Sequence, residues 1–74
     1  MKITVKLFAN FRAGRFVAEE RDYPAGTPIA AVAASLGLGS TEIGIIVLNG
    51  RHAEPETALK DGDVLAFFPL IGGG

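Results

Sequence analysis

One helical segment, lying between segments with the periodicity of strands, most restricts what this chain can fold into. Thr27 and Pro28 are typical of a helix start, because threonine caps the first turn and proline lacks the N–H that would stay unpaired there. Gly37 is typical of a helix end, since glycine tolerates a positive φ. Between them, apolar side chains recur at helical spacing, at Ile29, Val32, Ala33 and Leu36. The pattern predicts one amphipathic helix of about ten residues, which must cover the apolar face of a sheet.

Strand patterns occur on both sides of that helix. Residues 2–8 alternate between polar and apolar side chains, as in a strand with one buried face, and residues 45–48 are apolar on both faces, as in a central strand. Asn49-Gly50 predicts a two-residue hairpin, and Asp61-Gly62-Asp63 predicts a second tight turn. Pro69 would end the last strand, because it cannot donate to a ladder. The expected strands are residues 2–8, 15–23, 45–48, 51–54 and 64–68.

This order of elements, β-β-α-β-β-β, predicts an α+β fold of the β-grasp, ubiquitin-like kind. A mixed sheet of four or five strands would pack on one main helix. With 74 residues the chain is long enough for one small domain. We expect residues 1–69 to form that domain and residues 70–74 to form a flexible C-terminal tail.

The composition narrows the possible functions. The formal net charge is -1 and no run of lysine and arginine occurs, so nucleic acid and anionic membranes are not expected partners. The longest strongly apolar run, residues 43–48, is far shorter than the roughly 20 residues that cross a bilayer. The first residues alternate and do not form the continuous apolar stretch of a signal peptide. We therefore expect a cytoplasmic protein.

The chemistry-bearing residues do not suggest an enzyme that acts alone. There is no cysteine, which excludes disulfides, thiolate metal sites and a cysteine nucleophile. His52 is the only histidine and has no second ligand near it, and Asp61 and Asp63 fit turn chemistry, so no metal site is expected. The sequence contains no phosphate-binding glycine loop and no nucleophile–base pair. We expect no bound cofactor.

The tail is the unusual part of the sequence. Gly72, Gly73 and Gly74 add no side chain to the core and lose the most backbone entropy on ordering. The six residues from Pro69 to Gly74 could reach about 20 Å when extended. Such a thread could enter a narrow channel and present the carboxylate of Gly74 to a distant catalyst. The alternative interpretation is an ordinary frayed chain end.

Four segments, taken in order, carry a resemblance to a known family. They are a strand running into a Phe-Ala-x-x-Arg segment at residues 5–12, the hairpin Val47-Leu48-Asn49-Gly50, the segment 59–69 with its Asp-Gly-Asp turn, and the terminal Gly73-Gly74. Together they resemble the MoaD/ThiS family of ubiquitin-like sulfur carriers. Within it, Phe67-Phe68-Pro69 favours the small subunit of molybdopterin synthase. That subunit usually has Pro-Pro-Val where this chain has Pro69-Leu70-Ile71, which leaves the pathway open.

The resemblance implies a sulfur-carrying cosubstrate that is not an enzyme alone. An E1-like adenylating enzyme would consume ATP to activate Gly74, and a sulfur donor system would convert the adenylate to a thiocarboxylate. A large synthase subunit, or another sulfur-accepting enzyme, would take the sulfur while Gly72 and Gly73 thread into its site. The pathway implied is molybdopterin, the molybdenum and tungsten cofactor. Alternatives are thiamine or another sulfur-carrier pathway, a ubiquitin-like protein modifier, or a ubiquitin-like interaction module with an inert tail.

The residues next to the tail are candidates for docking to these partners. Phe67 and Phe68 point to opposite faces of an alternating strand, so at least one is expected outside the core. Phe8 lies on the face opposite the apolar side of the first strand. The alternative is that these are ordinary exposed aromatics. The expected apolar docking patch consists of Phe8, Phe67, Phe68, Leu70 and Ile71.

Overall fold

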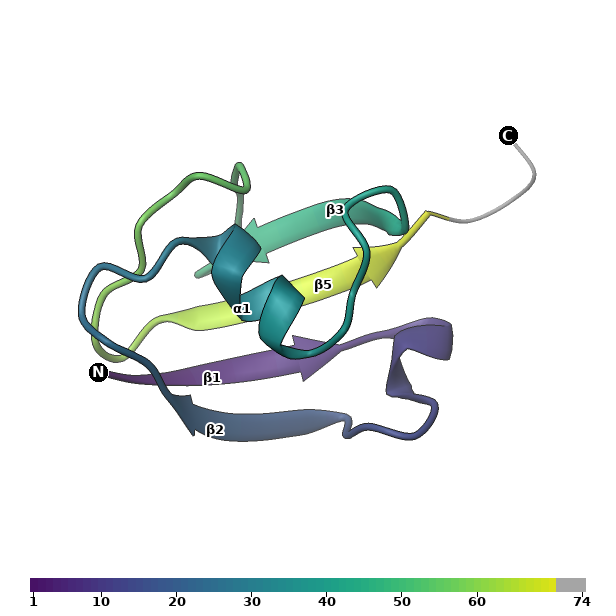
Figure 1. Cartoon of the computed structure of the whole chain (residues 1–74), viewed down its shortest axis with the longest axis horizontal. Helices are drawn as coiled ribbons and strands as arrows, with labels where there is room; N and C mark the ends of the chain where they lie inside the picture. The colour runs from purple at the N-terminus through teal and green to yellow at the C-terminus, as the bar shows by residue number, and fades with distance from the viewer. Residues whose placement is uncertain (71–74) are drawn as a thin grey trace.

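The computed structural model describes residues 1–70, which form a five-stranded mixed sheet with one α-helix on one of its faces (Figure 1). This confirms the predicted β-grasp fold. Of the predicted tail, only Leu70 lies within the described residues. The elements are β1 (Lys2–Leu7), the 3-10 helix η1 (Ala9–Arg12), β2 (Ala18–Asp22), α1 (Ile29–Ser35), β3 (Ile43–Leu48), β4 (Arg51–His52) and β5 (Val64–Pro69).

The strand order across the sheet is β2-β1-β5-β3-β4. β1 pairs antiparallel with β2 and parallel with β5, and β5 pairs antiparallel with β3, so the first and last strands lie side by side at the centre. β3 lies between β5 and β4, so the inner position predicted for residues 45–48 is confirmed. Only one of its faces is buried, however: Ile45 is 47% exposed on the face away from α1, whereas Ile46 is buried.

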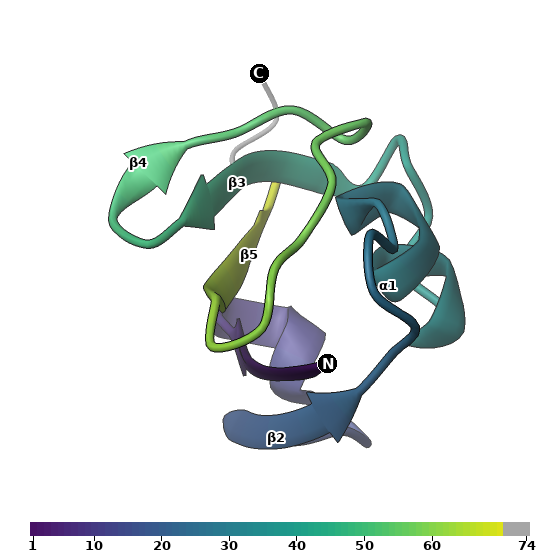
Figure 2. The same ribbon diagram turned by 90° about the vertical axis from the view of Figure 1, so that its left-hand side faces the viewer.

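The core lies between the sheet and α1. Figure 2, a view turned by 90°, shows α1 on one side of the sheet. Its side chains come from alternate residues of the strands and one stripe of the helix, which gives the alternation of β1 its physical cause. Each large side chain removed from water here contributes about 1.5–3 kcal/mol to folding. The largest fully buried ones are Ile3, Val5, Leu7, Ile29, Val32, Leu59, Leu65 and Phe67.

The helix begins one residue later than predicted and has no side-chain cap. Pro28 occupies the N-cap position, and the hydroxyl of Thr27 donates to the carbonyl of Pro24 at 2.7 Å instead of capping the helix. The first amides of α1 find partners elsewhere, since the N–H groups of Ile29 and Ala30 donate to carbonyls of Thr57 and Pro55 at 3.0 and 2.8 Å. Hydrogen bonds to a segment distant in sequence thus satisfy N–H groups that a capping side chain would otherwise bind.

The helix ends as the sequence predicts. Gly37 has a φ of +72° just after the last turn. The N–H of Leu38 donates to the carbonyl of Ala33, and the N–H of Gly37 donates to that of Ala34, both at 3.0 Å. These two bonds make a Schellman motif, and Leu38 is buried as its apolar contact.

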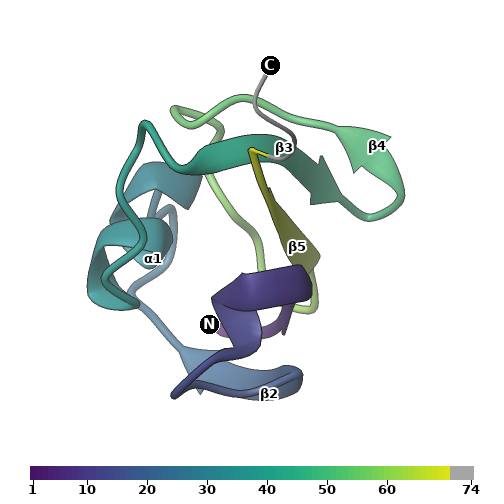
Figure 3. The same cartoon turned by 90° about the vertical axis from the view of Figure 1, so that its right-hand side faces the viewer.

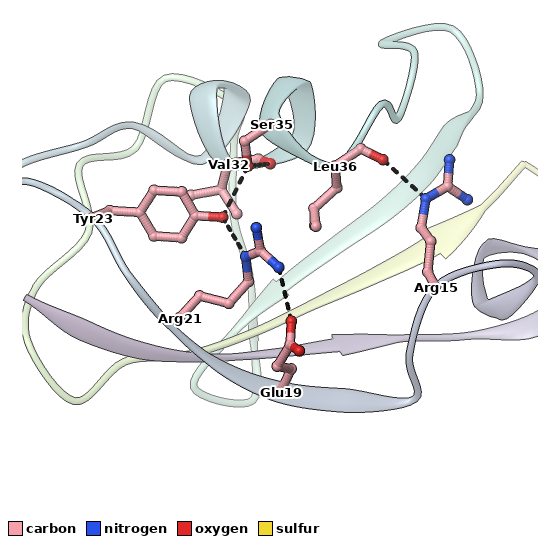
Figure 4. A network of polar contacts seen from close by, with 7 residues as sticks. All are labelled: Arg15, Glu19, Arg21, Tyr23, Val32, Ser35 and Leu36. Carbon is pink, nitrogen blue, oxygen red and sulfur yellow. Dashed lines mark hydrogen bonds and ion pairs between the residues drawn. The ribbon is translucent and has the colours of Figure 1, made fainter.

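A chain of polar contacts joins β2 to the end of α1 (Figure 4). Arg21 donates from Nε to the hydroxyl of Tyr23 at 2.9 Å, and from a second nitrogen to Glu19 at 2.7 Å. The Tyr23 hydroxyl lies 2.8 Å from Oγ of Ser35, and Ser35 donates to the carbonyl of Val32 at 2.6 Å. Because the Ser35 proton is used there, Tyr23 is the donor to Ser35. The hydrogen bond to Tyr23, followed by the contacts with Glu19, raises the pKa of Arg21 despite some desolvation.

Two turns that the sequence predicts separately are joined by their side chains. Asn49 and Gly50 both have positive φ, 51° and 81°, as a two-residue hairpin between β3 and β4 requires. The amide of Asn49 donates to Asp63 at 2.9 Å, and its oxygen accepts the N–H of Val64 at 2.8 Å. Asp63 also accepts the N–H of Lys60 at 2.8 Å. This link fixes where β5 begins, and with it the position of every later residue of that strand.

Candidate functional site

The described chain ends where β5 leaves the sheet. Pro69 is buried and pairs with Ile43, so it forms the last residue of β5, one later than predicted. The next residue, Leu70, has a side chain that is 71% exposed, while its N–H donates to the carbonyl of Glu42 at 2.8 Å. Where the chain leaves the domain, the backbone of Leu70 is therefore fixed by a hydrogen bond and its side chain is exposed to solvent.

Two aromatic rings lie together near that exit, on the face of the sheet opposite α1. Phe8, which follows β1, and Phe68 of β5 stack with ring centroids 4.2 Å apart and an interplanar angle of 10°. The guanidinium of Arg12, on η1, lies 5.1 Å from the centroid of the Phe8 ring. Figure 3 shows η1 beside β5, which explains how a residue of the 3-10 helix reaches this pair. Both rings are partly buried.

Neighbouring strands extend the aromatic pair into an apolar patch. Ile45 of β3 is the register partner of Phe68, and alternation places Val47 on the same face. We name Phe8, Ile45, Val47 and Phe68 the outer patch. Ile45 is an exposed large hydrophobic side chain, and such a group on a sheet face is typical of a contact surface. The sequence did not single out Ile45, because only the register with β5 brings it beside Phe68.

Phe67 does not belong to this patch. Its side chain is 0% exposed and packs in the core under α1, so it has no surface with which to touch a partner. Alternation required that one of Phe67 and Phe68 point inward, and the pairing of β5 with β1 and β3 determines that it is Phe67.

Of the remaining predicted site residues, one lies within the described part of the chain and four lie beyond it. Leu70 is exposed at the chain exit. Four predicted site residues lie outside the described residues: Ile71, Gly72, Gly73 and Gly74.

The described residues do not assemble a reactive centre. In residues 1–70 no three carboxylate, histidine or cysteine side chains come together as a metal site. His52 is exposed on β4. Over the same residues, no helix is both long and apolar enough to cross a bilayer. What the geometry provides is a contact face and an exposed exit at the end of its central strand.

These features define a ubiquitin-like β-grasp domain with an exposed chain exit. The sequence model of the ThiS family matches residues 5–74, and the chain belongs to that family. This confirms the resemblance to the MoaD/ThiS carriers. The chain is thus a ubiquitin-fold sulfur carrier or a modifier of the same type.

Solved structures agree with this assignment. A putative molybdopterin converting factor, subunit 1, from Pyrococcus furiosus is 30% identical, with a TM-score of 0.77 and coverage of 96% of this chain and 99% of that one. SAMP1 from Haloferax volcanii is 26% identical, with a TM-score of 0.76 and full coverage of both chains. One chain in the structure of the complex of subunits 1 and 2 of the molybdopterin-converting factor from Helicobacter pylori 26695 is also similar. It is 23% identical, with a TM-score of 0.67 and full coverage of both chains, and this similarity shows the shared fold alone. No curated protein sequence matches this chain.

Proposed function

We propose that this chain carries sulfur as a thiocarboxylate on Gly74 and gives it up during molybdopterin synthesis. The observation that carries the proposal is the family match, which extends from the folded domain through the terminal glycines to residue 74. The P. furiosus structure, described as a molybdopterin converting factor subunit, supports this pathway over the other sulfur-carrier pathways.

The proposed chemistry needs an enzyme partner, because a carboxylate is a poor electrophile. An oxygen of the Gly74 carboxylate attacks the α-phosphorus of ATP, which forms an acyl-adenylate and releases pyrophosphate. Sulfur from a donor then attacks the carbonyl carbon, and AMP leaves with the bonding electron pair. The product holds sulfur in place of one oxygen. The thiocarboxylate sulfur then bonds to the acceptor, and water cleaves the bond between this sulfur and the acyl carbon, which leaves sulfur on the acceptor and restores the carboxylate. An E1-like enzyme would catalyse the first step, and a large synthase subunit or another sulfur-accepting enzyme the last.

The outer patch is the surface proposed for docking to these enzymes. Phe8 and Phe68 supply flat apolar area that is already ordered by stacking, so little conformational entropy is lost when a partner covers it. Arg12 adds a positive charge at the rim, and Leu70 is exposed where the tail begins. A partner seated here would meet the first residue of the tail at the same time.

A second candidate function is protein modification, favoured by the similarity to SAMP1, named in a related structure as a small archaeal modifier protein. In that case the carbonyl of Gly74 would be joined to a lysine amine of a target protein. Both functions begin with the same adenylate, so a test must follow its fate.

Intact-mass spectrometry separates these functions. The purified chain is incubated with the E1-like enzyme of its own organism, ATP and sulfide. We expect a mass gain of about 16 Da, for oxygen replaced by sulfur. The matched controls are a reaction without ATP and a chain that ends at Ile71 and so lacks all three glycines, and neither should gain mass. In a parallel reaction that also contains lysate of that organism, adducts with other proteins that an isopeptidase cleaves would favour the modifier. An unchanged mass in both reactions would leave only the inert interaction module.

A further inference from the structure

The pairing of β3 with β5 contains one irregularity, and it lies beside the tail exit. Ile43 is the partner of Pro69 and Ile45 is the partner of Phe68, so two steps along β3 match one step along β5. The extra residue is Gly44. A bulge of this kind bends its strand and ends or redirects the ladder, and bulges are common next to functional sites.

Gly44 is needed here for space. A Cβ at this position would lie 2.9 Å from the carbonyl oxygen of Pro69, 3.0 Å from Cα of Leu70 and 3.1 Å from its nitrogen. All three atoms belong to the backbone, so no side-chain rotation can relieve the crowding. Its φ lies outside the left-handed region, unlike that of Gly37 or Gly50, so close approach of two backbones is what requires a glycine.

This close approach helps to hold a residue whose side chain is not anchored in the core. The side chain of Leu70 is 71% exposed and makes no contribution to the core. Its backbone is fixed by the hydrogen bond from its N–H to the carbonyl of Glu42 and by its position against Gly44. Glu42 and Gly44 thus form a clamp on the Leu70 backbone, and the clamp closes only when residue 44 has no side chain.

We propose that Gly44 is a positioning residue for the reaction at the tail, a proposal that rests on the proposed function. The clamp fixes the point from which the residues after Leu70 start. Four residues reach about 14 Å at most, so a displacement of a few ångströms at their root is a large share of that reach. Because attack of the carboxylate oxygen on the α-phosphorus tolerates little misplacement, loosening the root lowers the rate of adenylate formation.

The proposal separates turnover from docking. The outer patch is formed by side chains of Phe8, Ile45, Val47 and Phe68, and Gly44 contributes none. Loss of the clamp should therefore lower kcat for adenylate formation and leave KM for the activating enzyme little changed.

The test compares Gly44→Ala with Gly39→Ala. Gly39 lies in the connection before β3, also outside the left-handed φ region. A Cβ there would meet the carboxylate end of Glu42, which accepts the Gly39 N–H; this side chain can rotate away while the Glu42 carbonyl that binds Leu70 stays in place. Two quantities are measured for both variants: the hydrogen exchange of the Leu70 amide by NMR, and kcat and KM for ATP-dependent adenylation. For Gly44→Ala we expect Leu70 exchange to rise about tenfold and kcat to fall about tenfold or more, with KM within about threefold. Gly39→Ala should match the wild type.

A synthetic chain protects the test against a variant that fails to fold. An ester in place of the peptide bond between Pro69 and Leu70 removes the N–H that donates to Glu42 and adds no atom near Gly44. We expect it to lower kcat in the same way. The proposal is overturned if either change leaves kcat within about twofold of the wild type in a folded chain, or if Leu70 keeps its protection in Gly44→Ala. A wild-type chain that is never adenylated would instead overturn the proposed function.

Discussion

At the scale of single residues, Phe67 and Phe68 show how neighbours in sequence take opposite roles. Phe67 is fully buried under α1, whereas Phe68 faces away from the helix and stacks on Phe8. The two residues are of the same type and lie in the same strand, so substitutions of each can separate effects on stability from effects on docking.

We predict that Phe68→Ala raises KM for the activating enzyme about tenfold, because it removes the centre of the outer patch. Its cost in unfolding free energy should stay near the value of one aromatic pair, about 0.5–1.5 kcal/mol. Phe67→Leu should lower the free energy of unfolding by about 1–2 kcal/mol and leave KM unchanged, since it alters only the core. Urea unfolding and steady-state kinetics on the two variants check this, and an unchanged KM in Phe68→Ala would remove the outer patch from the docking model.

At the scale of elements, β2 and α1 depend on a polar link because β2 contributes little to the core. All but one residue of β2 are exposed. The hydrogen bonds from Arg21 through Tyr23 to Ser35 therefore join the edge of the sheet to the last turn of the helix.

Removing the Tyr23 hydroxyl tests that link. Tyr23→Phe should lower the free energy of unfolding by about 1 kcal/mol, since water can replace part of an exposed hydrogen bond. The pKa of Arg21 should fall toward its ordinary value, because the largest cause of its rise is lost. In a double-mutant cycle with Ser35→Ala, we expect a coupling of about 0.5 kcal/mol or more. Simple additivity of the two substitutions would show that the hydroxyls do not act together.

The elements also show how much of this protein could be predicted. Periodicity predicted all five strands, the helix and the turns at Gly37, Asn49 and Gly62, because these depend on local backbone preferences. It did not predict that carbonyls of residues 55 and 57 would satisfy the start of α1, or that Ile45 would join Phe68. Both depend on contacts between segments far apart in the sequence, and no local pattern encodes a register.

At the scale of the whole molecule, the core formed by residues 1–70 ends before the chain leaves the sheet. Every residue of the core cluster lies between Ile3 and Phe67. The residues that form the core and the glycines proposed to react therefore occupy separate segments of the sequence.

We predict that a chain ending at Leu70 keeps the unfolding free energy of the full chain within about 0.5 kcal/mol. Because it retains the outer patch, it should inhibit adenylation of the full-length chain competitively, with an inhibition constant near the wild-type KM. Chemical denaturation and inhibition kinetics measure these values. Loss of inhibition in a stable truncated chain would place the main binding energy beyond Leu70.

The central position of β5 has a consequence for how the protein is made. β5 lies between β1 and β3, so the hairpin β1-β2 and the hairpin β3-β4 cannot join into one sheet until residues 64–69 have been synthesised. A ribosome releasing this chain from its N-terminus would expose a hairpin and an amphipathic helix that cannot yet close over a core. Joining strands this distant in sequence is also slow, because a long loop must be closed first. Interrupted translation products would thus lack a docking face, and an activating enzyme that reads this face would act only on finished copies.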